Sequence, residues 1–160
     1  MIKTITNSRF DRRLAMKLST KGRYATRILL CISRLQGDQP VPKKRISEQE
    51  GISTDYIEQI IVPLKNAGLV SSVRGLRGGF RLAKDPADIT VYDILAASEG
   101  DINLVGCLAE GCSKSDTCVV QRVWQGASDE LRAYFSQITL RELHDDYDKQ
   151  TADQPINFSI

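Results

Sequence analysis

The sequence predicts a mainly α-helical protein with a small β component, which places it in the α+β class. Apolar residues recur at helical spacing along much of the chain, as in helices that bury one face. Residues 69–84 instead contain a Gly-Gly pair between short alternating segments, which is typical of a β-hairpin. From about Val119 an apolar stripe continues for roughly five turns, which predicts one long helix. A chain of 160 residues fits one domain, or one domain with an appended helical element.

The net charge of +2 conceals an asymmetry between two halves of the chain. Residues 1–81 contain 16 Lys/Arg and 6 Asp/Glu, a net of +10, whereas residues 82–160 contain 6 and 14, a net of −8. A basic half favours a polyanionic partner such as nucleic acid. The alternative is that the basic side chains only solvate helix faces.

The composition also indicates the cellular compartment of the protein and excludes some classes of function. Residues 1–15 lack the apolar run of a secretory signal, and no stretch reaches the roughly 20 apolar residues of a membrane span. We therefore expect a cytoplasmic protein with no membrane partner, where clustered cysteines indicate metal or redox chemistry more often than disulfides. The chain has no phosphate-binding glycine loop and no paired-carboxylate signature, so we expect neither an enzyme nor a small-molecule substrate.

A first helix, capped by Ser19 or Thr20, is predicted to run to about residue 36. Four basic residues crowd its start: Lys17, Lys21, Arg23 and Arg27. A phosphate would be well placed beside such a helix N-terminus, so Lys21 and Arg23 are candidate DNA contacts.

Two further helices are predicted on either side of a tight turn at Gly51. Ser53 caps the second, which contains Pro63, and a proline this deep should kink the helix or mark its break. Helix, glycine turn and helix make the helix-turn-helix pattern, whose second helix enters the major groove of DNA. Ser53 and the outward positions of this helix are therefore candidate contacts, the latter being Thr54, Asp55, Tyr56, Glu58 and Gln59. Glutamine can pair with adenine, and a carboxylate can accept from the amino group of cytosine.

The predicted hairpin that follows completes a winged helix-turn-helix domain. Its turn contains Arg74, Arg77, Gly78 and Gly79. The two arginines would reach a minor groove or phosphates at the tip of the wing. The alternative is an ordinary exposed hairpin.

Three of the four cysteines, Cys107, Cys112 and Cys118, form a C-x4-C-x5-C cluster. Thiolates bind zinc and iron–sulfur clusters. The spacing is a poor zinc pattern, since zinc sites commonly use pairs separated by two to four residues. An iron–sulfur cluster is the first choice, with zinc, or a thiol switch, as alternatives. Cys31 lies within an apolar run and is expected to be a small buried hydrophobe.

The long C-terminal helix carries large apolar side chains on one broad side. Among them are Val123, Trp124, Tyr134 and Phe135. In a DNA-binding protein, two-fold pairing along such a helix would cover them, so we expect a homodimer and interpret this as a dimerisation helix. The alternative is that the helix packs on its own domain. Thr139 and Glu142 then have the spacing of a capping box that opens a short helix to about residue 148.

Four parts of the chain follow from these patterns. They are a flexible N-terminal extension (1–15), the winged helix-turn-helix DNA-binding domain (16–86), the cysteine loop with the dimerisation helices (87–149) and a disordered tail (150–160).

Several segments carry a family likeness: Met16–Tyr24, Gly51–Ser53, Tyr56, Glu58–Gln59, Gly68–Gly75, Gly78–Phe80, the cysteine triad and Ile138–Leu143. Together they resemble the IscR/NsrR-type family of iron–sulfur winged-helix transcription regulators, from Met16 to about Asp148. The resemblance implies a homodimer that binds a pseudo-palindromic operator near promoters, with a cluster whose state changes affinity or site preference. It also implies that the segments around Ser53 to Gln59 and Arg74 to Gly79 contact DNA, with Glu58 discriminating between sites.

The sequence departs from the family pattern at the cluster. The first cysteine spacing is one residue shorter, Gln121 stands where the IscR type has a ligating histidine, and Arg23 stands where the NsrR type has a carboxylate. The fourth ligand therefore stays open among Glu110, Asp116, Gln121 and His144, and a 2Fe–2S cluster is placed ahead of 4Fe–4S. We expect a cluster-responsive regulator, with repression as the sign. The alternatives are a regulator that is zinc-bound or thiol-redox and, behind both, a small iron–sulfur redox carrier.

Overall fold

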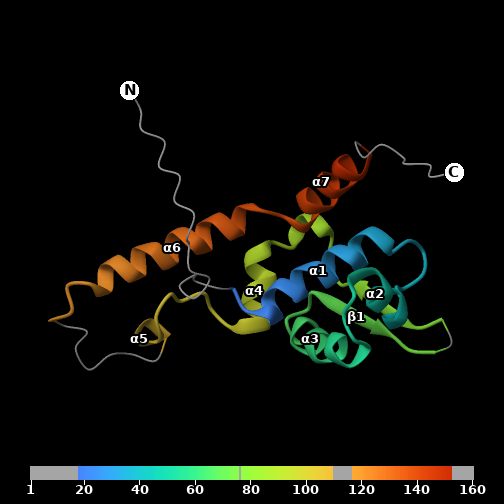
Figure 1. Ribbon diagram of the computed structural model, residues 1–160, viewed down its shortest axis with the longest axis horizontal. Coiled ribbons are helices and arrows are strands. Elements are labelled where there is room, and N and C mark those ends of the chain that lie inside the picture. The colour runs from blue at the N-terminus through green and yellow to red at the C-terminus, as the bar shows by residue number, and fades with distance from the viewer. Residues whose placement is uncertain (1–17, 76, 110–116, 153–160) are drawn as a thin grey trace, which may run out of the picture.

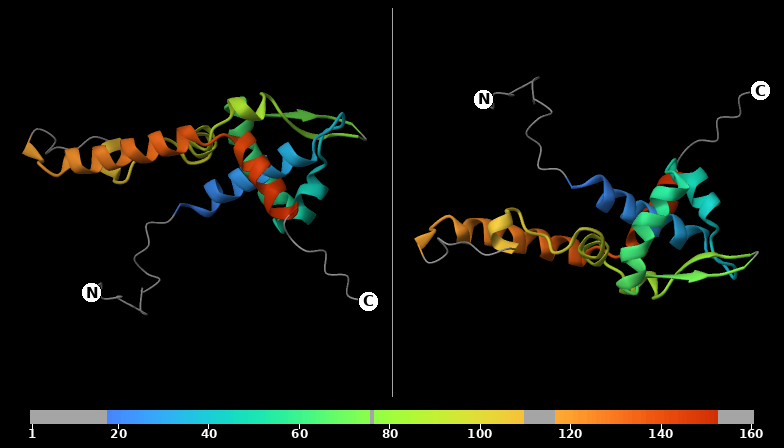
Figure 2. Two further views of the ribbon diagram at one scale, coloured as in Figure 1. Left: turned by 90° about the horizontal axis from the view of Figure 1, so that it is seen from above. Right: turned by 90° about the horizontal axis from the view of Figure 1, so that it is seen from below.

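The structure is a computed structural model that describes residues 18–75, 77–109 and 117–152. Its elements form a helical head from which one long helix projects, and both further views show the same projection (Figures 1 and 2). In chain order they are α1 (Thr20–Leu35), α2 (Lys43–Glu50), α3 (Thr54–Asn66), β1 (Val70–Val73), β2 (Gly79–Leu82), the 3-10 turn η1 (Pro86–Asp88), α4 (Val91–Glu99), α5 (Gly106–Ala109), α6 (Gln121–Gln137) and α7 (Leu140–Ala152).

The helices of the head begin and end where their capping residues predict. The Ser19 hydroxyl accepts from the Gly22 N–H at the start of α1, and the Ser53 hydroxyl accepts from the Tyr56 N–H at the start of α3. Gly51 ends α2 with a left-handed φ of 64°, a conformation that favours glycine. The helix-turn-helix prediction is confirmed, although α3 runs through Pro63 to Asn66 instead of breaking there.

One hydrophobic core joins α1, α3, α4 and the hairpin. The inward face of α3 is fully or almost fully buried: Ile57, Ile60, Ile61 and Leu64. It packs against buried side chains of α1, among them Ile28, Leu29 and Ile32. Burial of this apolar surface, rather than helix propensity, holds α3 on the head.

Strands β1 and β2 form the predicted antiparallel hairpin, with Val70 opposite Leu82 and Val73 opposite Gly79. A third segment, not anticipated from the sequence, pairs with it: Val41 and Phe80 exchange two backbone hydrogen bonds of 2.8 and 2.9 Å. This bridge ties the base of the hairpin to the loop before α2, which fixes the wing relative to the helix-turn-helix.

Helix α4 connects the head to the C-terminal helices. Thr90 and Asp93 form a complete capping box at its start. Its first N–H, on Val91, donates to the carbonyl of Ile138 between α6 and α7, and α4 packs against α1, α3 and α6. This helix therefore touches both the head and the long helix α6.

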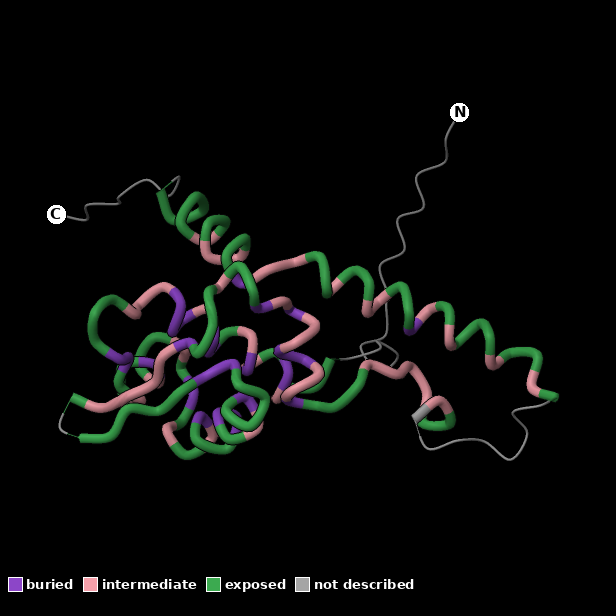
Figure 3. The backbone as a smooth tube through the Cα atoms, turned by 180° about the vertical axis from the view of Figure 1, so that it is seen from behind, coloured by how far each residue is buried: buried purple, intermediate pink, exposed green. Residues whose placement is uncertain are grey.

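Helix α6 leaves most of its surface uncovered, as the burial colours show (Figure 3). Helix α7 turns back onto α1 and continues to Ala152. The predicted tail is therefore wrong for Gln150 to Ala152, which extend α7, while residues 153–160 and the predicted extension 1–15 lie outside the described residues. None of the helices formed by the described residues is long and apolar enough to cross a bilayer.

Candidate nucleic-acid interface and cysteine site

The outward face of α3 presents the residues that the sequence analysis assigned to base contacts. Glu58 and Gln59 are exposed, whereas Thr54 and Tyr56 are half-buried. The Tyr56 ring packs edge-on against Tyr24 of α1, with ring centroids 5.9 Å apart. Tyr56 is therefore held in place by Tyr24, and only part of its side chain is exposed to a partner.

Glu58 is not alone on this face, because Lys43 at the start of α2 donates to its carboxylate. Both side chains are exposed, so the pair is accessible to a ligand. Lys43 was not predicted as part of this face. It begins the basic run Lys-Lys-Arg, but it lies ten or more residues before α3 in the sequence. An unpaired carboxylate would repel the phosphates of DNA, and Lys43 offsets that repulsion.

The Lys43–Glu58 pair predicts coupled effects on DNA binding. Lys43→Met should weaken binding about threefold more in the wild-type background than in a chain that also carries Glu58→Gln, since an exposed pair contributes roughly 0.2–1 kcal/mol. A double-mutant cycle of titrations on one DNA duplex measures this. Equal losses in both backgrounds would mean that Lys43 meets DNA independently of Glu58.

The start of α1 adds a basic edge beside α3. Arg23 is exposed and donates to the Thr20 hydroxyl at 3.3 Å, while Lys21 is half-buried. Arg27 is engaged within the head, because its guanidinium binds the carboxylate and the backbone carbonyl of Glu50 at 2.9 and 2.8 Å. Of these basic residues, Arg23 is exposed and Lys21 half-buried, and both remain candidate DNA contacts.

The wing carries its two arginines on the solvent side. Arg74 and Arg77 are both exposed. The turn is tight at Gly78, where an added Cβ would come within 2.8 Å of the Gly75 carbonyl oxygen. Gly78 therefore allows the chain to reverse sharply enough to hold both arginines at the tip.

Arg77→Ala should weaken DNA binding on all sequences and lower the slope of log affinity against log salt by about one, because it removes one phosphate contact. Salt titrations of binding to specific and random duplexes measure the slope. An unchanged slope would show that Arg77 does not meet a phosphate.

The cysteine triad is only partly visible. Cys107 lies exposed on α5, a short helix that the sequence analysis did not predict, and Cys118 lies half-buried just before α6. Both are free thiols, and Cys112 falls outside the described residues. In the part of the chain that the structure describes, no three His, Cys, Asp or Glu side chains form a metal site.

The fourth cysteine, Cys31, takes no part in this region. It is 1% exposed within the core, as predicted. Burial, with help from the nearby Glu50 carboxylate, raises the pKa of its thiol to about 11. Cys31 therefore stays protonated at neutral pH, in the form that binds metals poorly.

Two candidate fourth ligands can be placed. His144 sits on α7, where Nδ1 is 3.1 Å from the Ser33 hydroxyl and Nε2 is 3.5 Å from Asp148, so both ring nitrogens have neighbours. Its helix, α7, lies on the far side of the molecule from α5 (Figure 1). Gln121 opens α6, and its N–H donates to the Cys118 carbonyl at 3.1 Å. Gln121 is therefore the candidate nearer to the thiols within one chain; Glu110 and Asp116 lie outside the described residues.

Comparison with known proteins identifies the family of this winged-helix chain. Residues 18–146 match the Rrf2 family model, described as an iron-dependent transcriptional regulator. The chain belongs to the Rrf2 family. The regulator IscR of Photorhabdus laumondii is 40% identical over 129 residues, which cover 80% of this chain and 79% of IscR, and an Escherichia coli IscR is also 40% identical, covering 80% of each chain.

Solved structures agree on the Rrf2 fold. T. potens IscR is 35% identical with a TM-score of 0.73 and covers 88% of this chain and 95% of its own. CymR, the global cysteine regulator of B. subtilis, is 34% identical with a TM-score of 0.67 and covers 82% and 98%. The predicted winged-helix fold and family are confirmed, and this Rrf2 protein is a DNA-binding transcription regulator rather than an enzyme.

Proposed function

We propose that this Rrf2 protein is a homodimeric repressor that binds a pseudo-palindromic operator in the cytoplasm and reports the state of an iron–sulfur cluster. The cluster would be held by Cys107, Cys112 and Cys118. The observation that carries the proposal is a pair of free thiols, exposed Cys107 and half-buried Cys118, in the stretch that joins the head to α6 along the chain. Ligation there lies between the part that binds DNA and the part that would bind a second copy.

The surface of α6 supports the dimer. Val123, Trp124 and Tyr134 are 55%, 42% and 61% exposed in the single chain. A run of large apolar side chains in water is unfavourable and marks an interaction surface. A second copy of the same helix covers both surfaces at once with a single two-fold contact.

The exposed basic and polar face supports operator binding. Two copies of α3 would enter successive major grooves, with each wing and the start of each α1 on the flanking phosphates. The proposed contacts are Lys21, Arg23, Ser53, Thr54, Tyr56, Glu58, Gln59, Arg74, Arg77, Gly78 and Gly79. A dimer seated across a promoter in this way excludes other proteins from it, which is why repression is the proposed sign.

The chemistry of the described thiols fits a cluster. Cys107 is exposed and Cys118 is half-buried, so both thiols can be reached from solvent, as cluster ligands must be during assembly. A bound cluster supplies a change of charge and ligation when its oxidation state or iron supply changes. With three cysteines and an open fourth position, 2Fe–2S is proposed ahead of 4Fe–4S.

Anaerobic purification tests the cofactor directly. The proposal expects a coloured protein with visible absorption, and with iron and acid-labile sulfide in equal amounts. A colourless protein with one zinc per chain would replace the cluster by a zinc site. Cys107→Ala and Cys118→Ala should lose the colour and change operator affinity, whereas Cys31→Ala should keep both.

A further inference from the structure

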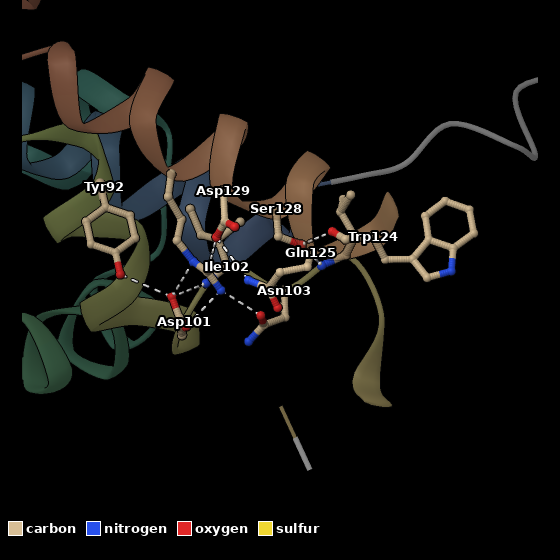
Figure 4. Close-up of polar contacts among 10 residues, drawn as sticks. Tyr92, Asp101, Ile102, Asn103, Trp124, Gln125, Ser128 and Asp129 are labelled. Carbon is tan, nitrogen blue, oxygen red and sulfur yellow. Dashed lines mark hydrogen bonds and ion pairs between the residues drawn. The ribbon is translucent and has the colours of Figure 1, made fainter. Parts of the chain in front are cut away.

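Arg132 of α6 binds the segment between α4 and α5. Figure 4 shows Asp101 and Asn103 of this segment among the polar contacts that join it to α6. The Arg132 guanidinium donates to both carboxylate oxygens of Asp101 at 3.0 Å and to the Asn103 side-chain oxygen at 2.7 Å. It also meets Asp129, one helical turn earlier, at 2.5 Å. The Arg132 side chain is only 22% exposed, so this is a partly buried cluster in which one cation serves three acceptor residues.

A second contact fixes the same segment. The N–H of Leu104 donates to the Ser128 hydroxyl at 3.1 Å, and that hydroxyl donates to the Trp124 carbonyl at 2.8 Å. Ser128 is fully buried. Residues 101–104 are therefore held against α6 at two points, immediately before the helix that carries Cys107.

Asp101 also connects this cluster to the head. The Tyr92 hydroxyl on α4 donates to the Asp101 carboxylate at 3.1 Å. On the inner side of α4, Ile94 belongs to the core that contains the buried face of α3. The Asp101 carboxylate thus links α4, which packs beneath α3, to α6, the proposed dimer helix. It lies in the segment that precedes Cys107.

The charges in this cluster do not change near neutral pH. Burial acts to raise the pKa of Asp101, but the hydrogen bonds from Tyr92 and Arg132 outweigh it and leave that pKa below its usual value. Arginine stays protonated throughout. Movement of the attached loop, rather than protonation, is therefore the event that can strain or release these contacts.

We infer that Arg132 is a positioning residue that transmits the ligation state of Cys107 to the DNA-binding head. The inference rests on the proposed cluster function. When Cys107 is drawn toward the other ligands, residues 101–104 must follow, since only two residues separate Leu104 from Cys107. Arg132 holds the Asp101 carboxylate in register with Tyr92, so the shift passes through the Tyr92 hydrogen bond to α4. Without Arg132, Asp101 is less firmly held and the Tyr92 hydrogen bond transmits less of the shift.

The test compares Arg132→Met, which keeps the aliphatic stem, with wild-type protein. The probe is a duplex selected from a random library by cluster-loaded wild-type protein. Affinity is measured anaerobically with the cluster and after its removal. Coupled sites typically change affinity 5–150-fold. The ratio of the affinity with the cluster to the affinity without it should lie in that range for wild type. For Arg132→Met at equal cluster content, the ratio should be below about threefold. Arg141→Met, which removes the same charge from a single exposed ion pair with Asp85, is the control and should keep the wild-type ratio.

Hydrogen exchange of cluster-free protein gives an independent readout. The Leu104 amide should exchange faster in Arg132→Met than in wild type, and equally fast in the control. Asp101→Asn weakens the same contact from the other side, and should lower the ratio even if Arg132→Met folds poorly. A wild-type ratio near one defeats the proposed function itself. A large wild-type ratio that Asp101→Asn and Arg132→Met leave unchanged defeats only this inference.

Discussion

Trp124→Glu is expected to turn the dimer into a monomer and lower operator affinity about 100-fold. A central aromatic in an interface typically contributes roughly 2–4 kcal/mol, and every 1.4 kcal/mol is a factor of ten. The new carboxylate would also have to be buried without a partner. A monomer contacts one half-site, so the contacts of the second copy disappear from the affinity.

Light scattering during gel filtration measures the mass, and titration of an operator duplex measures the affinity. Ala133→Glu is the matched control, because Ala133 is exposed and lies about two and a half turns along α6, on the opposite side of the helix. It should remain dimeric with unchanged affinity. A Trp124→Glu protein that keeps the dimer mass would show that α6 is not the contact between copies.

Local signals predicted most of the head. Ser19, Ser53, Gly51 and the Thr90 capping box act within a few residues of their own position, so their effect can be read along the chain. Contacts between distant segments could not be predicted in this way. The Val41–Phe80 bridge and the Lys43–Glu58 pair depend on how the elements pack, which no local pattern contains.

The cysteine region shows the same division. Residue type and spacing identify three thiols as candidate ligands, whereas the Arg132 contacts with Asp101 and Asn103 join positions about thirty residues apart. The single chain places His144 on α7 against Ser33, which leaves Gln121 as the nearer candidate for the fourth ligand. Glu110 and Asp116, which lie outside the described residues, stay candidates beside Gln121.

Ile60→Ala should lower the free energy of unfolding by about 2–4 kcal/mol, since deleting buried methyl groups loses transfer free energy and leaves a cavity. Ile60 is 0% exposed on α3, and its side chain packs into the core shared with α1 and α4. The milder Ile60→Val should cost about 0.5–1.5 kcal/mol. Urea unfolding followed by circular dichroism measures all three proteins.

Val62→Ala provides the control on the same helix. Val62 is 56% exposed, so its truncation should change stability by no more than about 0.5 kcal/mol. Domains of this size are stable by roughly 5–15 kcal/mol in total, so the Ile60→Ala loss is a large fraction of what holds α3 in place. DNA affinity of the fully folded fraction should stay close to wild type, because Ile60 faces the core rather than the groove. Similar losses of stability for Ile60→Ala and Val62→Ala would contradict the assignment of the buried and DNA-facing sides of α3.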